Sequence, residues 1–372
     1  MNLFELLYVK TPASLRFIYL PIQTIRYLRI NKWLLAGLEP NTKQELAILF
    51  VGNETNMHYL ADLAFSGHCK ISYLGKIWFF LIPRISHAKN SKWSIFVAAI
   101  PNLLIHVDNS FCIPSWIQGN INITENLQEI IKKHKTLQTD QRRIKTNLLS
   151  FEVTNDESKL HDFYYTMYLP YINKRFRNPL VTKYQTLKGQ FPNYELILIK
   201  SKDKEIGGEI ITYAGHEPHL LLLGVKDGDP QYVKIGFFGA LYYFTLEYLR
   251  EKGFQKVDVG LSRPFLKDSA LNYKKRWGLK INGHENLCFM LSLLKTTDGS
   301  NAFLTNNPFI YMNGGEYDCA VLMDDNKPID DTIMTNITEK YLFAGISKIN
   351  IFNTKENDLI LVKQISQQEN VN

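Results

Sequence analysis

The sequence is poor in cysteine. Only four cysteines occur among 372 residues, and they are scattered, with no C-x-x-C pair and no regular spacing. A disulfide framework or a zinc site needs such spacing, so the sequence predicts neither, and no metal is expected. A reducing cytoplasm fits this usage. The four are Cys69, Cys112, Cys288 and Cys319.

Long apolar runs are also missing. The longest, Ile77 to Ile82 and Ser94 to Ile105, are shorter than the roughly 20 residues with which a helix crosses a bilayer. The N-terminus has no short apolar run followed by a small-residue cleavage site, as a secretion signal would. The sequence therefore predicts a cytoplasmic protein.

Residues 1–40 form a basic, amphipathic segment that is expected to be helical. Two uses fit this composition. Residues 1–32 can contact an anionic membrane surface, which would make the protein peripheral to the membrane, or the helix can pack its basic face on its own domain. The basic residues among Leu, Ile, Tyr and Phe are Lys10, Arg16, Arg26, Arg29 and Lys32.

Three catalytic motifs are absent. Gly260, Leu261 and Ser262 lack the second glycine of a nucleophile elbow, no G-K-[ST] is present, and no H-E-x-x-H is present. The sequence thus argues against an elbow-type hydrolase, a phosphate-loop kinase and a zinc hydrolase.

The composition is that of a folded protein with large cores. Hydrophobic residues make up 45% of the chain and charged residues 21%, and the length favours two domains. The 43 Lys and Arg exceed the 36 Asp and Glu, for a net charge of +7. This excess favours partners that carry phosphate without identifying one.

The first α/β domain is expected over residues 41–146, linker included. A strand at Glu45 to Val51 ends at Gly52, and a helix follows from Asn53 to Phe65. Short apolar runs then predict strands. The run from 119 to 146 has a basic second half, which suits a solvated helix and linker or an anion site. The strands are expected at 71–73, 77–82, 94–99 and 103–107.

A second domain is expected over 147–296, followed by an extension over 297–372 that covers one sheet edge. Three strands joined by tight turns predict an antiparallel meander, and Asp229 with Pro230 starts a long helix. In chain order we expect a strand at 149–153, helices at 157–171 and near 189, strands at 195–200, 209–214 and 219–225, a helix at 229–249, a strand at 255–260, a helix at 267–277 and a strand at 286–294.

This order of elements resembles the GNAT superfamily of acyltransferases. The text LLLGVKDGDPQYVKIGFFGALYYFTLEYLREKGFQKVDVGLSRPFLKDSALNYKKRWG is similar to the GNAT-like half of Fem-type and exopolysaccharide-associated acyltransferases. A looser likeness begins at Arg142 and includes MYLPYINKRF. The resemblance implies an α/β (α+β) fold, with a GNAT-like mixed sheet flanked by helices. A second α/β domain, itself a candidate for a degenerate GNAT-like unit, precedes that sheet.

The resemblance implies a gap between two strands. In GNAT enzymes the strands that correspond to His219 to Val225 and Lys256 to Gly260 part, and an acyl thioester lies between them. Backbone N–H groups freed there can hold the carbonyl oxygen as it gains negative charge. Acetyl-CoA or another acyl-CoA is then the implied cofactor, with Val225 beside it.

The resemblance places the cofactor pyrophosphate on the helix after Val225. The nearest text to the family's phosphate loop holds Lys234, Gly236 and Gly239, a partial match. Asp229 argues against this site, because its carboxylate would occupy the helix N–H groups and repel phosphate. Close helix packing is the other explanation for the two glycines, and both stay open.

The segment Tyr273 to Gly278 resembles the aromatic-Lys-x-x-aromatic-Gly motif of Fem-type transferases. That resemblance implies that Tyr273 stacks on the acyl-carrying end of a tRNA and that Lys274 holds a phosphate. A solvated basic helix face is the alternative. The neighbouring residues expected to bind substrate are Arg263, Lys275, Arg276 and Trp277.

Acyl transfer to an amine needs a group that removes a proton and one that protonates or stabilises the leaving group. Asp258, in the middle of a gap strand, is the preferred base or substrate anchor, and Tyr273 the preferred acid. Asp258 could equally cap a turn or pair with Arg263.

Three functions follow as expectations. The first is transfer of an acyl group from acyl-CoA to an amino or hydroxyl group of a small molecule, sugar or cell-envelope precursor. The second is a Fem-type transfer from aminoacyl-tRNA, against which stands the missing helical-arm insertion. The third is a non-catalytic module that binds a membrane surface or a phosphoglycan.

Overall fold

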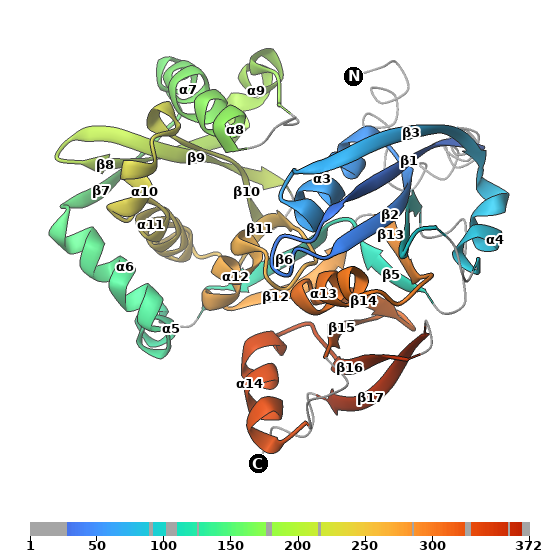
Figure 1. The fold of residues 1–372 in the computed structure, drawn as a ribbon. Helices are drawn as coiled ribbons and strands as arrows, with labels where there is room; N and C mark the ends of the chain where they lie inside the picture. The colour runs from blue at the N-terminus through green and yellow to red at the C-terminus, as the bar shows by residue number, and fades with distance from the viewer. Residues whose placement is uncertain are drawn as a thin grey trace.

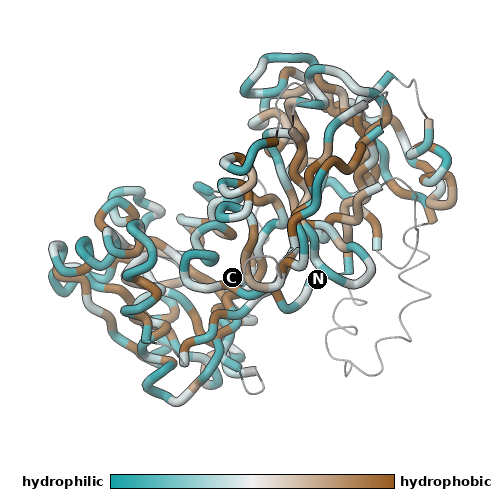
Figure 2. The backbone as a smooth tube through the Cα atoms, turned by 90° about the horizontal axis from the view of Figure 1, so that it is seen from below, coloured by the Kyte–Doolittle hydropathy of each residue, from teal (hydrophilic) through white to brown (hydrophobic). Residues whose placement is uncertain are grey.

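The computed structural model describes residues 28–88, 92–101, 110–124, 126–175, 181–214, 217–284, 286–323, 329–355 and 358–366. The described residues form two mixed β-sheets flanked by helices (Figure 1). Seen at right angles to that view, the chain forms two lobes with apolar strands inside them (Figure 2). The mixed α/β fold expected from the sequence is confirmed.

The first sheet has ten strands from both ends of the chain, in the order β17-β16-β15-β14-β5-β13-β4-β2-β1-β3. Helix α3 (Glu54–Phe65) starts at Asn53, whose side chain accepts from the Asn56 amide, and it covers β1 and β2. The other helices of this half are α4 (Ile82–Ser86), α13 (Asp298–Asn306) and α14 (Asp331–Tyr341). The strands are β1 (Arg29–Leu38), β2 (Glu45–Gly52), β3 (Cys69–Trp78), β4 (Ile95–Pro101), β5 (Phe111–Pro114), β13 (Leu287–Leu293), β14 (Phe309–Asn313), β15 (Glu316–Leu322), β16 (Lys348–Lys355) and β17 (Asp358–Ser366).

The second sheet has seven strands in the order β12-β6-β11-β10-β9-β8-β7. Strands β8 to β10 form the expected antiparallel meander, and β7 extends it, because each strand pairs with the next in the chain. The strands are β6 (Ile117–Asn122), β7 (Leu149–Thr154), β8 (Tyr194–Ser201), β9 (Lys204–Ala214), β10 (Glu217–Val225), β11 (Lys256–Ser262) and β12 (Leu279–His284).

Helices cover both faces of the second sheet. One face carries a continuous helical run, α7 (Glu157–Phe163), η4 (Tyr164–Tyr168) and α8 (Leu169–Arg175), together with α9 (Tyr184–Gln190). The other carries α11 (Phe237–Glu251), whose buried residues Leu241 and Leu246 lie in the largest core. The remaining helices are α5 (Leu127–Lys133), α6 (Lys135–Thr146), α10 (Pro230–Lys234) and α12 (Ser269–Arg276), and the short turns are η2 (Phe79–Leu81), η5 (Phe191–Asn193) and η6 (Lys226–Gly228).

Three local expectations were wrong. The strand expected at 77–82 ends at Trp78, because η2 and α4 follow, and Pro83 suits the first turn of α4. The helix expected over 229–249 is broken at Gly236, which has φ 109°. Arg29 to Leu38, expected to be helical, form the strand β1. The strand expected at 103–107 and residues 1–27 of the basic segment lie outside the described residues.

Sheet membership crosses the boundaries expected at 146 and 296. Strand β6 from the first half lies between β11 and β12, and β13, expected to complete the second half, belongs to the ten-stranded sheet. The last strand of the seven-stranded sheet in chain order is instead β12, in which Leu279 and Ile281 are buried and Lys280 is exposed. Strands β14 to β17 extend the first sheet, and the four-part division into domains stays a prediction.

Candidate functional site

Strands β10 and β11 run parallel but separate almost at once. They share a single register position, His219 with Asp258, whereas β10 pairs with β9 as far as Val225. Beyond that position the edge of β10 that faces β11 is free of a strand partner among the described residues. A gap between these strands, as the resemblance implied, is therefore present.

A bulge in β11 bends it away from β10. The register with β6 shifts between Asp258 and Leu261, and Gly260 between them has φ 69°, a left-handed conformation that favours glycine. The Asp258 carboxylate closes this turn, because Oδ1 accepts from the Gly260 amide at 2.8 Å. Strand β10 is irregular at the same level, since its register with β9 shifts between Leu220 and Leu222. Local irregularities in both strands thus accompany their separation.

Lys274 holds the same bulge from helix α12. Its ammonium donates to the carbonyl oxygens of Gly260 at 3.2 Å and Leu261 at 2.9 Å and to Ser262 Oγ at 3.0 Å. The side chain is buried, which lowers the pKa of Lys274 to about 8. Lys274 therefore does not project into solvent as a phosphate ligand would, because its side chain is buried and its ammonium donates to β11.

His219 and Asp258 form a hydrogen-bonded pair at the last paired position. His219 Nδ1 lies 3.0 Å from Asp258 Oδ2, and Gln118 Nε2 of β6 donates to the same oxygen at 2.6 Å. Burial opposes ionisation of Asp258, but the hydrogen bonds from His219, the Gly260 amide and Gln118 outweigh it and lower its pKa. Asp258 is therefore held as a carboxylate, and it pairs with His219 rather than with Arg263.

Tyr273 does not point into the gap. Its hydroxyl donates to Asp140 Oδ2 of α6 at 3.2 Å, and its ring packs edge-on against Tyr242 at 5.2 Å. Burial and the neighbouring Asp140 charge raise the pKa of Tyr273 well above its ordinary value. Trp277 is 1% exposed and stacks on Tyr242. Both aromatic residues of the Fem-like motif thus pack in the core. There Tyr273 cannot stack on a tRNA end, and Trp277 cannot contact a substrate.

The predicted phosphate loop is covered by helix α6. A Cβ atom at Gly236 would lie 2.8 Å from Arg143 Cβ, and one at Gly239 would lie 2.5 Å from Asp140 Cβ. Close packing against α6 therefore accounts for both glycines. Asp229 caps α10, accepting from the Gln231 amide at 2.8 Å. These residues do not fit a pyrophosphate at this helix start. Lys234 is exposed on α10, and Val225 is buried at the end of β10.

The remaining basic residues are dispersed. The Arg263 guanidinium lies between the rings of Tyr59 and Trp116, at 3.7 and 3.6 Å from their centroids. Lys275 donates to the Lys340 carbonyl oxygen at 2.7 Å, and burial lowers its pKa to about 8. Arg276 is half-buried on α12. The structure therefore does not gather Arg263, Lys275 and Arg276 around one ligand, and their substrate-binding role stays a prediction.

Glu209 is a buried acid on the α11 side of β9. Thr245 Oγ1 donates to its Oε1 at 2.8 Å, and burial raises the pKa of Glu209 to about 8 in spite of that hydrogen bond and the charge of Lys274. With 2% exposure it cannot meet a solvent-borne substrate.

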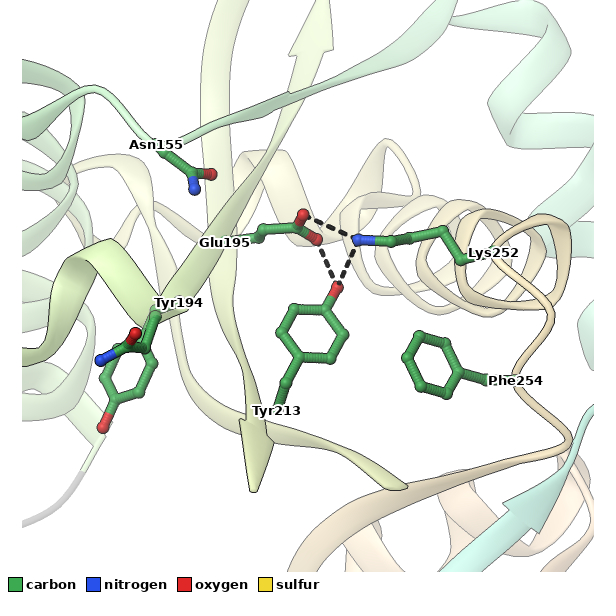
Figure 3. A pocket seen from close by; sticks show the side chains of 7 residues that line it. Asn155, Tyr194, Glu195, Tyr213, Lys252 and Phe254 are labelled. Carbon is green, nitrogen blue, oxygen red and sulfur yellow. Dashed lines mark hydrogen bonds and ion pairs between the residues drawn. The ribbon is translucent and has the colours of Figure 1, made fainter. Parts of the chain in front are cut away.

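A separate cavity of about 320 Å³ lies where β8 begins and β9 ends (Figure 3). Its Glu195 carboxylate accepts from Lys252 at 2.8 Å and from Tyr213. Tyr213 also stacks on Phe254. These contacts join Glu195, Tyr213 and Lys252 to one another. The cavity lies at the other end of β10 from Val225, so it is not the gap. Its lining residues are Asn155, Asn193, Tyr194, Glu195, Tyr213, Lys252 and Phe254.

Comparisons with known proteins give weak similarities. No family model and no curated protein sequence matches the chain. Among solved structures, FemX is 13% identical with a TM-score of 0.36, over 69% of this chain and 83% of that one. The C-terminal domain of a putative lysylphosphatidylglycerol synthetase from Agrobacterium fabrum is 12% identical with a TM-score of 0.35, over 73% and 84%. An aminoglycoside acetyltransferase from an uncultured soil metagenomic sample is 22% identical with a TM-score of 0.26, over 36% and 88%. These values are too low to support an assignment by themselves.

The sequence interpretation missed His219 and Gln118. His219 was seen only as the first residue of a strand, and Gln118 lies in a segment assigned to another domain. The available signal was a histidine and an aspartate in the two strands of the implied gap. Their register and the insertion of β6 cannot be read from a single sequence.

Proposed function

We propose that the chain is an acyltransferase that binds an activated acyl group in the gap between β10 and β11. The observation that carries the proposal is that the parallel strands β10 and β11 share a single register position. Each nevertheless stays paired with its other neighbour, β10 with β9 and β11 with β6. Backbone N–H groups on the free edge of β10 are suited to hold the acyl carbonyl oxygen as negative charge develops on it. Fixed donors of this kind are worth about 3 kcal/mol each in acyl transfer.

The donor in this proposal is an acyl-CoA thioester, with an aminoacyl-tRNA ester as the alternative. Since α6 covers Gly236 and Gly239, the phosphates of CoA must bind elsewhere. Lys174 and Lys226 lie at the turn after β10, where Lys174 Nζ donates to the Asp227 carbonyl oxygen at 2.7 Å. These two lysines are the proposed phosphate partners at the open end of the gap, where Asp227 and Asp229 of the same turn offset part of their charge. The acceptor in the proposal is an amino or hydroxyl group of a sugar or cell-envelope precursor, the class that the resemblance implies.

The experiment is a transfer assay with acetyl-CoA and, in parallel, with charged tRNA, each offered to a panel of amino sugars and envelope precursors. Gly260→Ala tests whether the acyl group binds in the gap, because the added Cβ would lie between β10 and β11, 3.3 Å from the Leu220 carbonyl oxygen. Gly253→Ala is the matched control, since Gly253 also has a positive φ, 88°, and a Cβ there meets nothing within 4 Å. We expect transfer by the wild type and by Gly253→Ala, with at least a tenfold loss in Gly260→Ala. Absence of transfer from both donors would refute the proposal.

A second candidate function is attachment to an anionic membrane surface, favoured by one edge of the ten-stranded sheet. Trp78 and Phe80 stack at 5.8 Å and are 43% and 59% exposed, and the Arg29 guanidinium lies 5.4 Å over the Trp78 ring. The sequence from 63 to 107 contains no Asp or Glu, while Lys70 and Lys76 lie on the same edge strand, β3. Exposed aromatic rings beside uncompensated positive charge suit the interface of an anionic bilayer. Within the described residues no helix is long and apolar enough to cross a membrane.

Co-sedimentation with vesicles tests this attachment. We expect the protein to bind phosphatidylglycerol vesicles, to release at high salt, and to ignore phosphatidylcholine vesicles. The variant Trp78→Ser with Phe80→Ser should lose binding, whereas Ile360→Ser with Leu361→Ser should keep it. That control removes exposed apolar residues from β17, the opposite edge of the same sheet. Equal binding by both double variants would rule out the β3 edge.

A further inference from the structure

We infer that His219 and Asp258 form a catalytic dyad in which His219 Nε2 removes the proton from the attacking amino or hydroxyl group of the acceptor. The inference rests on the proposed acyl transfer and names its base, with Asp258 as the positioning residue. Neither the composition nor the motifs of the sequence indicated a role for His219.

The hydrogen bonds around Asp258 fix the orientation of the imidazole. Asp258 accepts from the Gly260 amide through Oδ1 and from Gln118 through Oδ2, so the carboxylate is held from both sides. His219 Nδ1–H then donates to Oδ2 at 3.0 Å. A neutral imidazole that donates through Nδ1 carries its lone pair on Nε2, the atom that accepts a proton in general base catalysis.

Nε2 is available to a substrate. The His219 side chain is 30% exposed, and Nε2 has no hydrogen-bond partner among the described residues. Asp258, which lies on the Nδ1 side of the ring, is 16% exposed. A partly exposed imidazole that is hydrogen-bonded to a carboxylate is oriented as a base, and the carboxylate stabilises the imidazolium that forms.

The dyad lies where the two strands begin to separate. His219 and Asp258 are the paired position itself, and a Cβ at Gly260 would lie 3.8 Å from His219 Cε1. Val257 and Val259, on either side of Asp258, pack in the core under α11. Since side chains alternate along a strand, Asp258 and its partner His219 face away from α11. An acceptor that approaches on this face can therefore reach His219 Nε2 at the start of the gap.

The other candidate bases near the gap are occupied. Glu209 is buried under α11, Lys274 is bound to the carbonyl oxygens of the bulge, and Tyr273 is bound to Asp140. Among these residues only His219 combines an accessible lone pair with a fixed orientation.

The proton and bond changes balance without a further reactant. As the acceptor nitrogen or oxygen attacks the thioester carbonyl carbon, its proton passes to His219 Nε2 and a new C–N or C–O bond forms. Collapse of the tetrahedral intermediate breaks the C–S bond, and the imidazolium returns the proton to the leaving thiolate. With an ester donor the C–O bond breaks instead, and the ribose oxygen receives the proton.

The test is chemical rescue of His219→Ala by free imidazole, in the transfer assay that shows wild-type activity. We expect kcat to fall by about 10²- to 10⁴-fold with little change in KM, and imidazole to restore part of the loss in His219→Ala but none in His219→Gln. His161→Ala is the control, because His161 also lies beside an aspartate, 3.6 Å from Asp162, but on helix α7. Nitrogen NMR of the histidines supplies a readout independent of turnover: Asp258→Asn should reduce the Nδ1–H tautomer of His219.

The outcomes separate the dyad from the proposed function. A wild type that transfers acyl groups together with an equally active His219→Ala would overturn the dyad and leave the transferase intact. A wild type inactive with both donors would remove both. A third result would also overturn the inference: His219→Ala loses activity that imidazole does not restore, and the His219 tautomer in Asp258→Asn stays that of the wild type. His219 would then be needed for packing alone.

Discussion

Among the described residues, the crossover from β15 to β16 and the crossover from β10 to β11 each end in a parallel strand pair, and the two pairs behave differently. Strand β15 leads through α14 to β16, and the two pair at five positions, from Asp318 with Lys348 to Leu322 with Phe352. Strand β10 leads through α10 and α11 to β11, and the two pair at His219 with Asp258 alone. The same topology thus gives a closed pair in one sheet and an open pair in the other.

The residues of the second strand explain the difference. In β16, Ile349 and Ile351 are fully buried, so a continuous ladder also completes a core. In β11, Gly260 adopts a left-handed conformation, Asp258 caps the turn, and Lys274 reaches the carbonyl oxygens from outside the sheet. An open pair needs such replacements, because buried backbone groups without partners are costly. The comparison teaches that the gap is held open by specific polar contacts.

The largest expected effect comes from removing Lys274. In Lys274→Met, two carbonyl oxygens and the Ser262 hydroxyl lose a buried donor, so the free energy of unfolding should fall by about 2–4 kcal/mol. Urea unfolding followed by circular dichroism measures this change. Transfer activity should fall as well, because the bulge that bends β11 loses its support.

Lys340→Met is the control in the other crossover. Lys340 is exposed on α14, so its replacement should change the free energy of unfolding by less than about 0.5 kcal/mol. If Lys274→Met unfolds at the same urea concentration as this control, the ammonium does not hold the gap open.

The next effect is a pH dependence at Glu209 of β9, the strand that pairs with β10 of the open pair. The pKa of Glu209 is about 8 in the folded chain and 4.5 ordinarily, so the folded state binds this proton more tightly. The contribution of this proton to the free energy of unfolding is complete below pH 4.5 and is lost as the pH rises through 8. Glu209→Gln keeps an acceptor for Thr245 and cannot ionise. Its melting temperature relative to wild type should therefore rise between pH 5 and pH 8.

The matched substitution for this pH series is Glu339→Gln, at an exposed carboxyl group of α14 in the closed crossover. We expect its difference from wild type to stay constant across the same pH range. A constant difference for Glu209→Gln as well would mean that water or movement keeps Glu209 solvated.

Much of the seven-stranded sheet and its helices could be predicted from the sequence. The Asp229 cap, Pro230 and the three alternating runs from 195 to 225 each have a local cause, and each element is present. Long-range insertion has no local cause. The strand 117–122 enters between β11 and β12 because it completes their core, and no neighbour in sequence signals this.

The candidate site was less predictable than the fold. Asp258 was singled out from its place in a gap strand, but its partner depends on a register between strands 39 positions apart at His219 and Asp258. Lys274 and Tyr273 were misjudged because a basic helix with flanking aromatics suits both a solvated face and a buried one. The packing of α12 against α11 and α6 buries that face, and helix periodicity does not determine which neighbour covers it.

The smallest expected effect is a difference in the free energy of unfolding between the removal of two buried serine hydroxyl groups. Ser262 Oγ accepts from Lys274 at 3.0 Å, whereas the Ser292 hydroxyl of β13 is buried without a partner among the described residues. Ser262→Ala should lower the free energy of unfolding by about 1 kcal/mol, because a buried ammonium loses one acceptor. Ser292→Ala should leave it unchanged or raise it, because an unpaired buried hydroxyl is removed. Chemical unfolding of both variants measures the difference. The opposite order would mean that the two remaining carbonyl oxygens satisfy Lys274 and that the end of β11 is held open by its backbone alone.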